Sequence, residues 1–173
     1  MIRYKKSLGQ NFLHDKNIIN KIVKIGNISE DKVVLEIGPG SGNLTNEIIA
    51  MNPKKLIAIE KDANLLKKLK KKFENINNLK FINDDILKCI NLISEKNVVV
   101  FGNLPYNIST QILANLILLK KWPPWYSNLI FMFQKEVADR IIAKTNTKEF
   151  GRLSVLSNWR LEIKKHFNVS KNS

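Results

Sequence analysis

The stretch VVLEIGPGSGNLT at residues 33–45 is the part of the sequence that says most about the fold. Its first five residues are apolar at four positions, as in a buried strand, and the segment from Leu44 onward has helical periodicity. Between them, Gly38, Gly40 and Gly42 allow a sharp turn and let the backbone come within contact distance of a ligand. A strand, a glycine loop and a helix in this order are typical of a nucleotide-binding α/β sheet, although glycine turns after strands also occur for structural reasons alone.

The same alternation of strand and helix continues along the chain and predicts an α/β fold with a mostly parallel sheet and helices on both faces. Near the N-terminus, a helix is predicted between Asp15, which would cap it, and Gly26, which would end it. Near the C-terminus, a helix is predicted at 153–159 and a sixth strand at 161–169. Residues 1–173 are expected to form one domain. The other predicted strands are 33–37, 56–59, 79–82, 98–101 and 129–133, and the other predicted helices are 44–50, 63–73, 109–119 and 135–143.

Acidic residues end the second and third predicted strands. Glu60 follows Gly38 by 22 residues, which is where a nucleotide fold places the carboxylate that accepts hydrogen bonds from ribose hydroxyls. Asp84 and Asp85 end the next strand. Because the carboxyl ends of parallel strands share one edge, the glycine loop and these carboxylates should meet in one crevice that suits an adenosine.

The spacing of the glycines distinguishes between adenosine cofactors. A dinucleotide fingerprint needs a third glycine five residues after the first, but that position is Asn43, and the pattern is G-x-G-x-G. No G-x-x-x-x-G-K-[ST] occurs either, so an NTPase is disfavoured. A methyl donor such as S-adenosylmethionine fits this loop better than a nicotinamide dinucleotide does.

The tetrapeptide Asn103-Leu104-Pro105-Tyr106 directly follows the fourth strand. The 6-amino group of adenine is a poor nucleophile, so a site that methylates it should bind both amine hydrogens and clamp the ring. The side-chain carbonyl of Asn103 and the backbone carbonyl of Leu104 can accept those hydrogens. Pro105 stiffens the turn and Tyr106 offers a stacking face. The sequence therefore predicts adenine N6 chemistry without a strong base.

Composition points to a polyanionic partner. The 173 residues include 29 Lys and Arg but only 15 Asp and Glu, which leaves a net charge of +14. A single cysteine, Cys89, and an N-terminus without an apolar leader are typical of a cytoplasmic protein. The apolar stretch at 112–133 is interrupted by lysines and prolines, so no membrane span is expected, and no ligand spacing indicates a metal site.

Taken together, these motifs resemble the ribosomal RNA adenine dimethyltransferases, which modify two adjacent adenosines near the 3′ end of small-subunit (16S) rRNA. The resemblance covers nearly the whole chain and implies a Rossmann-like class I methyltransferase fold that uses S-adenosylmethionine. Two positions depart from the usual pattern, with Phe150 in place of tyrosine and Asp84 in place of a frequent glycine. The matching stretches are KKSLGQNFL at 5–13, LEIGPGSGNLT at 35–45, IEKD at 59–62, NDDIL at 83–87, NLPYNIST at 103–110, FQKEVADRI at 133–141 and FGRLSV at 150–155.

This resemblance also assigns roles to individual residues. Glu60 would bind ribose, Asp85 would meet the cofactor adenine, and Asn103 with Tyr106 would handle the target base. The implied catalytic positions are Asn103, Leu104, Pro105 and Tyr106. The implied cofactor-binding positions are Asn11, Leu13, Gly38, Gly40, Gly42, Glu60, Asp85 and Asn103. Candidate RNA-binding residues are Lys5, Lys6, Arg140 and Arg152.

Members of that family continue beyond the position of Val169 into a target loop, a final antiparallel strand and a small helical domain. We therefore expect a truncated chain that lacks the antiparallel strand and binds the cofactor more readily than it completes turnover. The expected partner is small-subunit rRNA in the pre-30S particle. The expected state is a monomer whose open sheet edge could self-associate.

Three other functions stay open. The closest is large-subunit rRNA adenine methylation, which the G-P-G-S-G loop and F-G-R-L-S disfavour. A non-catalytic RNA-binding factor in ribosome assembly or transcription is a different class, and the intact Asn103–Tyr106 motif speaks against it. A nicotinamide dehydrogenase is the most distant. Trp122, Trp125 and Tyr126 suit either base stacking or a loop packed by its own aromatic rings.

Overall fold

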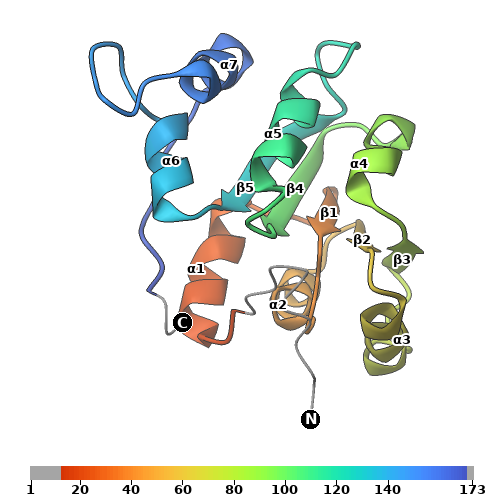
Figure 1. The fold of residues 1–173 in the computed structure, drawn as a ribbon. Coiled ribbons are helices and arrows are strands. Elements are labelled where there is room, and N and C mark those ends of the chain that lie inside the picture. The colour runs from red at the N-terminus through yellow and green to blue at the C-terminus, as the bar shows by residue number, and fades with distance from the viewer. Residues whose placement is uncertain (1–12, 171–173) are drawn as a thin grey trace.

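The computed structural model describes residues 13–170, and within them the strands form one parallel sheet with the order β3-β2-β1-β4-β5 (Figure 1). Each strand leads into a helix or helical turn, so the chain repeats the βαβ unit that the sequence predicts. The strands are β1 (Val33–Ile37), β2 (Lys55–Glu60), β3 (Leu79–Asn83), β4 (Val98–Asn103) and β5 (Tyr126–Met132). The helices are α1 (Lys16–Ile25), α2 (Asn43–Ala50), α3 (Ala63–Lys72), α4 (Ile86–Cys89), α5 (Ser109–Ile117), α6 (Lys135–Ile141) and α7 (Arg152–Arg160), with a 3-10 turn η2 (Ile90–Leu92).

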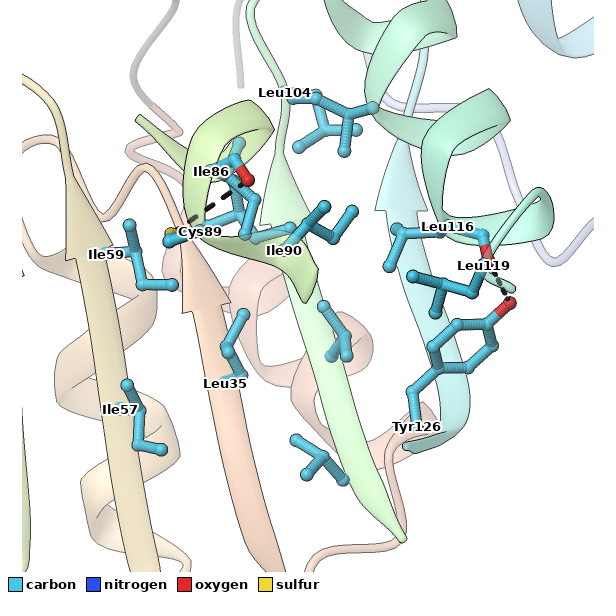
Figure 2. Close-up of a cluster of buried hydrophobic side chains, with 14 residues drawn as sticks. Leu35, Ile57, Ile59, Ile86, Cys89, Ile90, Leu104, Leu116, Leu119 and Tyr126 are labelled. Carbon is cyan, nitrogen blue, oxygen red and sulfur yellow. Dashed lines mark hydrogen bonds between the residues drawn. The ribbon is translucent and has the colours of Figure 1, made fainter. Parts of the chain in front are cut away.

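Alternation along the strands divides the core into two layers. On β4, Val98 and Val100 pack with α4 and α5, whereas Val99 and Phe101 pack with α1 and α2 on the opposite face. Figure 2 shows the first layer, in which Leu35, Ile57 and Ile59 lie under Ile86 and Ile90. Because helices cover both faces, β1 and β4 are apolar at nearly every position and are buried.

Local sequence signals set the helix boundaries. The Asp15 carboxylate accepts hydrogen bonds from the backbone N–H groups of Asn17 and Ile18, and Gly26 ends α1 as expected. Asp62 caps α3 in the same way, through the N–H groups of Asn64 and Leu65. These caps satisfy N–H groups that would otherwise have no partner at the first turn of each helix.

The elements differ from the sequence prediction in several places. The predicted strand at 161–169 is wrong, because residues 161–170 have no regular secondary structure and pair with none of the strands described. A strand needs a neighbour to bond its backbone, and this segment is mostly exposed instead. β5 begins at Tyr126, earlier than predicted, and α3 ends at Lys72. The short helix α4 and the turn η2 between β3 and β4 were not predicted.

The helices α5, α6 and α7 form a separate apolar contact beyond β5. Leu113 and Ile117 of α5 meet Ile141 of α6, and Leu153 and Leu156 of α7 pack against them. Ser154 fixes the start of α7, since its hydroxyl donates to the carbonyl of Arg140 and accepts from the N–H of Gly151. No helix in the described part of the chain is long and apolar enough to cross a membrane.

Candidate cofactor and adenine site

The glycine loop after β1 has the backbone conformation that only glycine adopts freely. Gly38, Gly40 and Gly42 have φ angles of 68°, 57° and 78°. The loop is fixed by two backbone bonds, from Gly38 N to the Ile59 carbonyl at 2.9 Å and from Gly42 N to the Pro39 carbonyl at 2.8 Å. A methyl group added at Gly38 would meet no heavy atom within 4 Å. The loop thus leaves open space beside the end of β1.

Glu60, the last residue of β2, holds this loop in place. One carboxylate oxygen accepts from the Gly40 N–H at 3.2 Å, and the other accepts from the Asp62 N–H at 2.9 Å. The side chain is buried, and burial raises its pKa above the ordinary glutamate value. Each oxygen has a second lone pair, so the carboxylate can also accept from the two hydroxyls of a ribose.

A second buried carboxylate, Glu36, lies behind the loop. The Thr45 hydroxyl donates to it at 2.7 Å, and both residues are buried. Burial raises the pKa of Glu36 to about 7, with a contribution from the negative charge of Glu60. Sequence reasoning missed this pair. A glutamate inside an otherwise apolar strand was the signal that could have revealed it.

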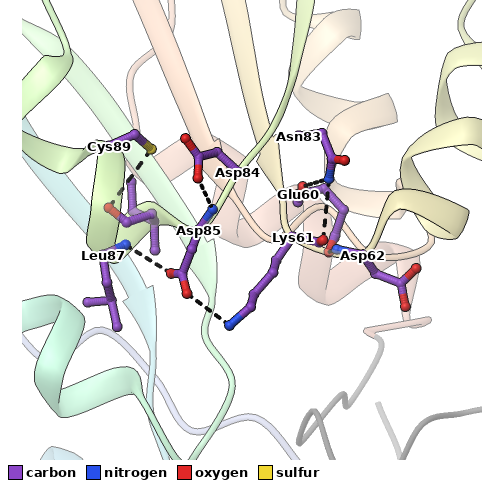
Figure 3. Close-up of polar contacts among 9 residues, drawn as sticks. Glu60, Lys61, Asp62, Asn83, Asp84, Asp85, Leu87 and Cys89 are labelled. Carbon is purple, nitrogen blue, oxygen red and sulfur yellow. Dashed lines mark hydrogen bonds and ion pairs between the residues drawn. The ribbon is translucent and has the colours of Figure 1, made fainter.

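Asp85 lies across from Glu60 at the end of β3 (Figure 3). Its carboxylate caps α4 by accepting from the Leu87 N–H at 3.0 Å and forms an ion pair with Lys61 at 2.8 Å. The hydrogen bond from Lys61 lowers the pKa of Asp85, so the group is charged at neutral pH. Asn83 braces the neighbouring backbone by donating to the carbonyls of Glu60 and Lys61. The adenine contact assigned to Asp85 stays a prediction.

The tetrapeptide after the fourth strand divides into residues of different exposure. Asn103 ends β4, where it pairs with Met132 of β5, and it is half-buried. The Leu104 side chain is buried in the core, which leaves its backbone as the part available for recognition. Pro105 begins a turn in which its carbonyl accepts from the Ile108 N–H at 3.1 Å. The Tyr106 side chain is 41% exposed, as a stacking surface for a large substrate must be.

One pocket connects these elements at the carboxyl edge of the sheet. Among its lining residues are several that the sequence singled out, which are Leu13, Gly38, Gly40, Glu60, Asp85, Asn103 and Pro105. Gly42, Leu104 and Tyr106 are outside the lining. Gly42 instead packs its backbone against the side chains of Leu69 and Phe73. The glycine loop and the first and third residues of the adenine motif therefore line one pocket, as a transfer reaction between two bound molecules requires.

Asn43, which distinguished this loop from a dinucleotide fingerprint, has a structural role. Its amide donates to the Leu13 carbonyl at 2.8 Å and ties the segment before α1 to the start of α2. Lys72 adds a second bond to the loop by donating to the Ser41 carbonyl at 3.2 Å. Lys72, the last residue of α3, therefore helps to hold the glycine loop.

The predicted RNA contacts are not gathered at this pocket. Arg140 forms an ion pair with Glu136 on α6, and Arg152 begins α7, so both belong to the outer helices. Asn11, Lys5 and Lys6 lie outside the described residues. Within residues 13–170, no group of three His, Cys, Asp or Glu side chains is placed to hold a metal ion.

The fold and the pocket define a class I methyltransferase, as the sequence predicted. A family profile described as "Ribosomal RNA adenine dimethylase" matches residues 1–172. The chain belongs to this family.

Individual relatives agree with the family assignment. The chain is 53% identical over 173 residues to a ribosomal RNA small subunit methyltransferase A from Pelagibacter ubique, and the matched region covers 99% of this chain and 65% of the relative. It is 43% identical to the protein of the same name from Rhizobium etli, over 95% of this chain and 61% of the relative. The chain thus spans less than two thirds of the length of these relatives.

Solved structures show the same fold. A dimethyladenosine transferase from Plasmodium falciparum superposes with a TM-score of 0.73 at 32% identity, over 84% of this chain and 51% of that one. The 23S rRNA methyltransferase ErmE superposes with a TM-score of 0.67 at 28% identity, over 85% of this chain and 55% of that one.

Proposed function

We propose that this chain is the methyltransferase domain of an enzyme that transfers methyl groups from S-adenosylmethionine to the 6-amino groups of two adjacent adenosines near the 3′ end of 16S rRNA. The observation that carries the proposal is the single pocket lined by the glycine loop, Glu60 and Asp85 on one side and by Asn103 and Pro105 on the other. The names of the small-subunit relatives support the choice of RNA. Such an enzyme acts in the cytoplasm during assembly of the 30S particle.

The residues present fit an adenosine cofactor. Gly38 leaves open space where a side chain would obstruct a ligand, and Glu60 offers paired oxygens for a ribose. Asp85 offers a charged acceptor for an adenine amine. A related fold, an RNA methyltransferase from Salinibacter ruber with a TM-score of 0.56, was solved with S-adenosyl-L-homocysteine.

In the proposed reaction, the bound cofactor supplies an electrophilic methyl group on a sulfonium sulfur, and the departing group is a neutral thioether. The Asn103 side-chain carbonyl and the Leu104 backbone carbonyl hold the two hydrogens of the adenine amine. This turns the nitrogen lone pair toward the methyl group. As the N–C bond forms and the S–C bond breaks, the amine becomes acidic, and it releases one proton to solvent water for each methyl gained. Pro105 stiffens the turn and Tyr106 stacks on the ring, which fixes the direction from which the base approaches.

The test is methylation of ribosomal subunits that lack the modification, followed by mass spectrometry of the isolated rRNA. The protein is supplied at its full genomic length, with Asn103→Ala as the matched variant. Dimethyladenosine at two adjacent positions of 16S rRNA supports the proposal. Modification of 23S rRNA would instead favour the large-subunit class, to which ErmE belongs by name. Cofactor binding without any methyl transfer would favour a non-catalytic RNA-binding role.

A further inference from the structure

An aromatic and cationic stack lies away from the pocket. The Arg160 guanidinium is 4.7 Å from the ring centre of Trp122 and 4.0 Å from that of Trp159. The same guanidinium donates to the carbonyls of Ile117 at 2.9 Å and Leu119 at 3.1 Å. One side chain therefore fixes two tryptophan rings from separate elements against the end of α5.

Both rings remain accessible although they are held in place. Trp122 is 42% exposed and Trp159 is 59% exposed, which is unusual for the largest apolar side chain. The neighbouring Trp125 differs, since its indole N–H donates to the Ile90 carbonyl and its ring meets Tyr126 edge to face. Of the two interpretations that the sequence left open, self-packing thus accounts for Trp125 and Tyr126 but not for Trp122.

Positive charge predominates in the sequence segments around the stack. Lys120 and Lys121 precede Trp122 and are exposed. No Asp or Glu occurs between residues 96 and 135 and none occurs in α7, while the exposed Glu162 follows α7 by two residues. On the exposed side of α7, Arg152 and Val155 share a shallow groove with Trp159. Exposed aromatic rings beside several exposed cations are typical of proteins that bind single-stranded nucleic acid.

This surface and the proposed active site lie at opposite ends of the strands. Trp122 belongs to the loop before β5, at the amino edge, whereas the pocket lies at the carboxyl edge. Figure 1 shows α7 and the loop after α5 at the top of the view, with the arrow of β4 pointing away from them. The stack is therefore not an extension of the adenine pocket.

We propose that Trp122 and Trp159 bind unpaired bases of an RNA segment outside the adenine pocket, with Lys120 and Lys121 contacting its phosphates. The inference rests on the proposed function only in taking RNA as the partner. A rigid pair of rings costs little conformational entropy on binding, and every base has a face that can stack on them. The excess of cations over acidic residues in these segments favours a polyanion over a protein surface of mixed charge.

The experiment measures binding of a 12-nucleotide unstructured RNA by fluorescence anisotropy at near-physiological salt. The stack variant Trp122→Leu/Trp159→Leu keeps apolar surface but removes the aromatic faces. We expect its affinity to fall by roughly 5- to 100-fold for each stacked base that is lost. The control Met51→Ser/Leu92→Ser alters exposed apolar side chains elsewhere, and its affinity should equal that of the parent chain.

Two further measurements keep the result specific. A perfectly paired RNA hairpin should bind the stack variant and the parent alike, because its bases already stack on each other. Tryptophan emission of the unmodified chain should be quenched by the unstructured RNA. Equal affinity of the two chains for unstructured RNA, or an equal loss for the hairpin, would overturn the inference and leave a protein as the better partner.

The result is independent of the proposed chemistry. If the stack binds RNA but no rRNA becomes methylated, the proposed function fails and this inference stands. If methylation proceeds normally and the stack variant binds unstructured RNA like the parent, the proposed function stands and this inference fails.

Discussion

Thr45 donates a 2.7 Å hydrogen bond to Glu36, and the two side chains are 0% and 1% exposed. The bond links β1 to the first turn of α2 beneath the glycine loop. Because the glutamate is desolvated and close to Glu60, its pKa rises from 4.5 to about 7. Glu36, which lies behind the glycine loop, therefore titrates near neutral pH.

This shift predicts a pH-dependent stability. The folded chain binds a proton at Glu36 more tightly than the unfolded chain does, so this residue favours folding most below about pH 4.5. Its contribution should be lost as pH rises through about 7, at a total cost of about 3 kcal/mol. Chemical unfolding between pH 4 and 8 measures it. Glu36→Gln should flatten part of the slope and be more stable than the parent at pH 8.

Thr45→Val serves as the opposite variant. It keeps the shape of the side chain but leaves the carboxylate without its hydroxyl donor, which should cost about 1–3 kcal/mol at pH 8. If the free energy of unfolding of Glu36→Gln changed with pH by the same amount as that of the parent, the role of this pair would be contradicted. Glu60 also has a raised pKa, so some slope should persist in Glu36→Gln.

The glycine loop allows a second prediction, which separates folding from binding. A Cβ at Gly42 would lie 2.7 Å from Leu69 and 2.9 Å from Phe73, in addition to the strain of φ +78°. Gly42→Ala should therefore destabilise the chain by about 2–4 kcal/mol. Gly38→Ala has comparable backbone strain but no clash, so it should cost only about 1–2 kcal/mol.

Binding should show the reverse order. Gly38 lines the pocket and Gly42 does not, so the added methyl group at Gly38 should weaken binding of S-adenosylhomocysteine more than the one at Gly42. Thermal melts and calorimetry on the two variants provide the measurements. A larger loss of affinity in Gly42→Ala, measured where both variants are folded, would show that Gly38 does not face the ligand.

A third prediction concerns Asp85, in which one carboxylate oxygen caps α4 and the other pairs with Lys61. Asp85→Asn keeps a carbonyl that can cap α4 through Leu87, so the fold should persist. It loses the charge that would attract the cofactor amine, and affinity for S-adenosylhomocysteine should fall about tenfold. The exposed ion pair with Lys61 should contribute less than about 1 kcal/mol to stability. Calorimetry measures this loss, and the exposed Asp31→Asn, which lies outside the pocket lining, is the control that should bind like the parent.

Much of the fold follows from patterns that are local in sequence. Continuous apolar runs predicted β1 to β4, and capping residues such as Asp15 predicted where helices begin. The glycine spacing and Glu60 predicted one crevice because parallel strands must end at one edge. These features depend on backbone geometry, which neighbouring residues determine.

The features that sequence reasoning missed depend on contacts between distant residues. Periodicity does not reveal that Lys61 pairs with Asp85 or that Arg160 joins Trp122 to Trp159. The segment at 161–169 has strand-like residues, but a strand forms only beside a partner, and β5 has none on that side among the residues described. Tertiary context thus overrode local propensity there.

The final prediction concerns Glu60, whose carboxylate must hold the glycine loop and still accept from a ribose. In Glu60→Gln one oxygen becomes an NH₂ group, which cannot accept from the Gly40 or Asp62 N–H or from a hydroxyl. Losing a charged acceptor should weaken S-adenosylhomocysteine binding by roughly 10- to 100-fold. The melting temperature should change little, because removing a desolvated charge offsets the lost hydrogen bond. Calorimetry decides the matter, with the exposed Glu74→Gln as the control that should bind like the parent. The same titrations with NAD should show no binding to the parent chain. Binding of NAD that Glu60→Gln abolishes would mean that the crevice holds a dinucleotide.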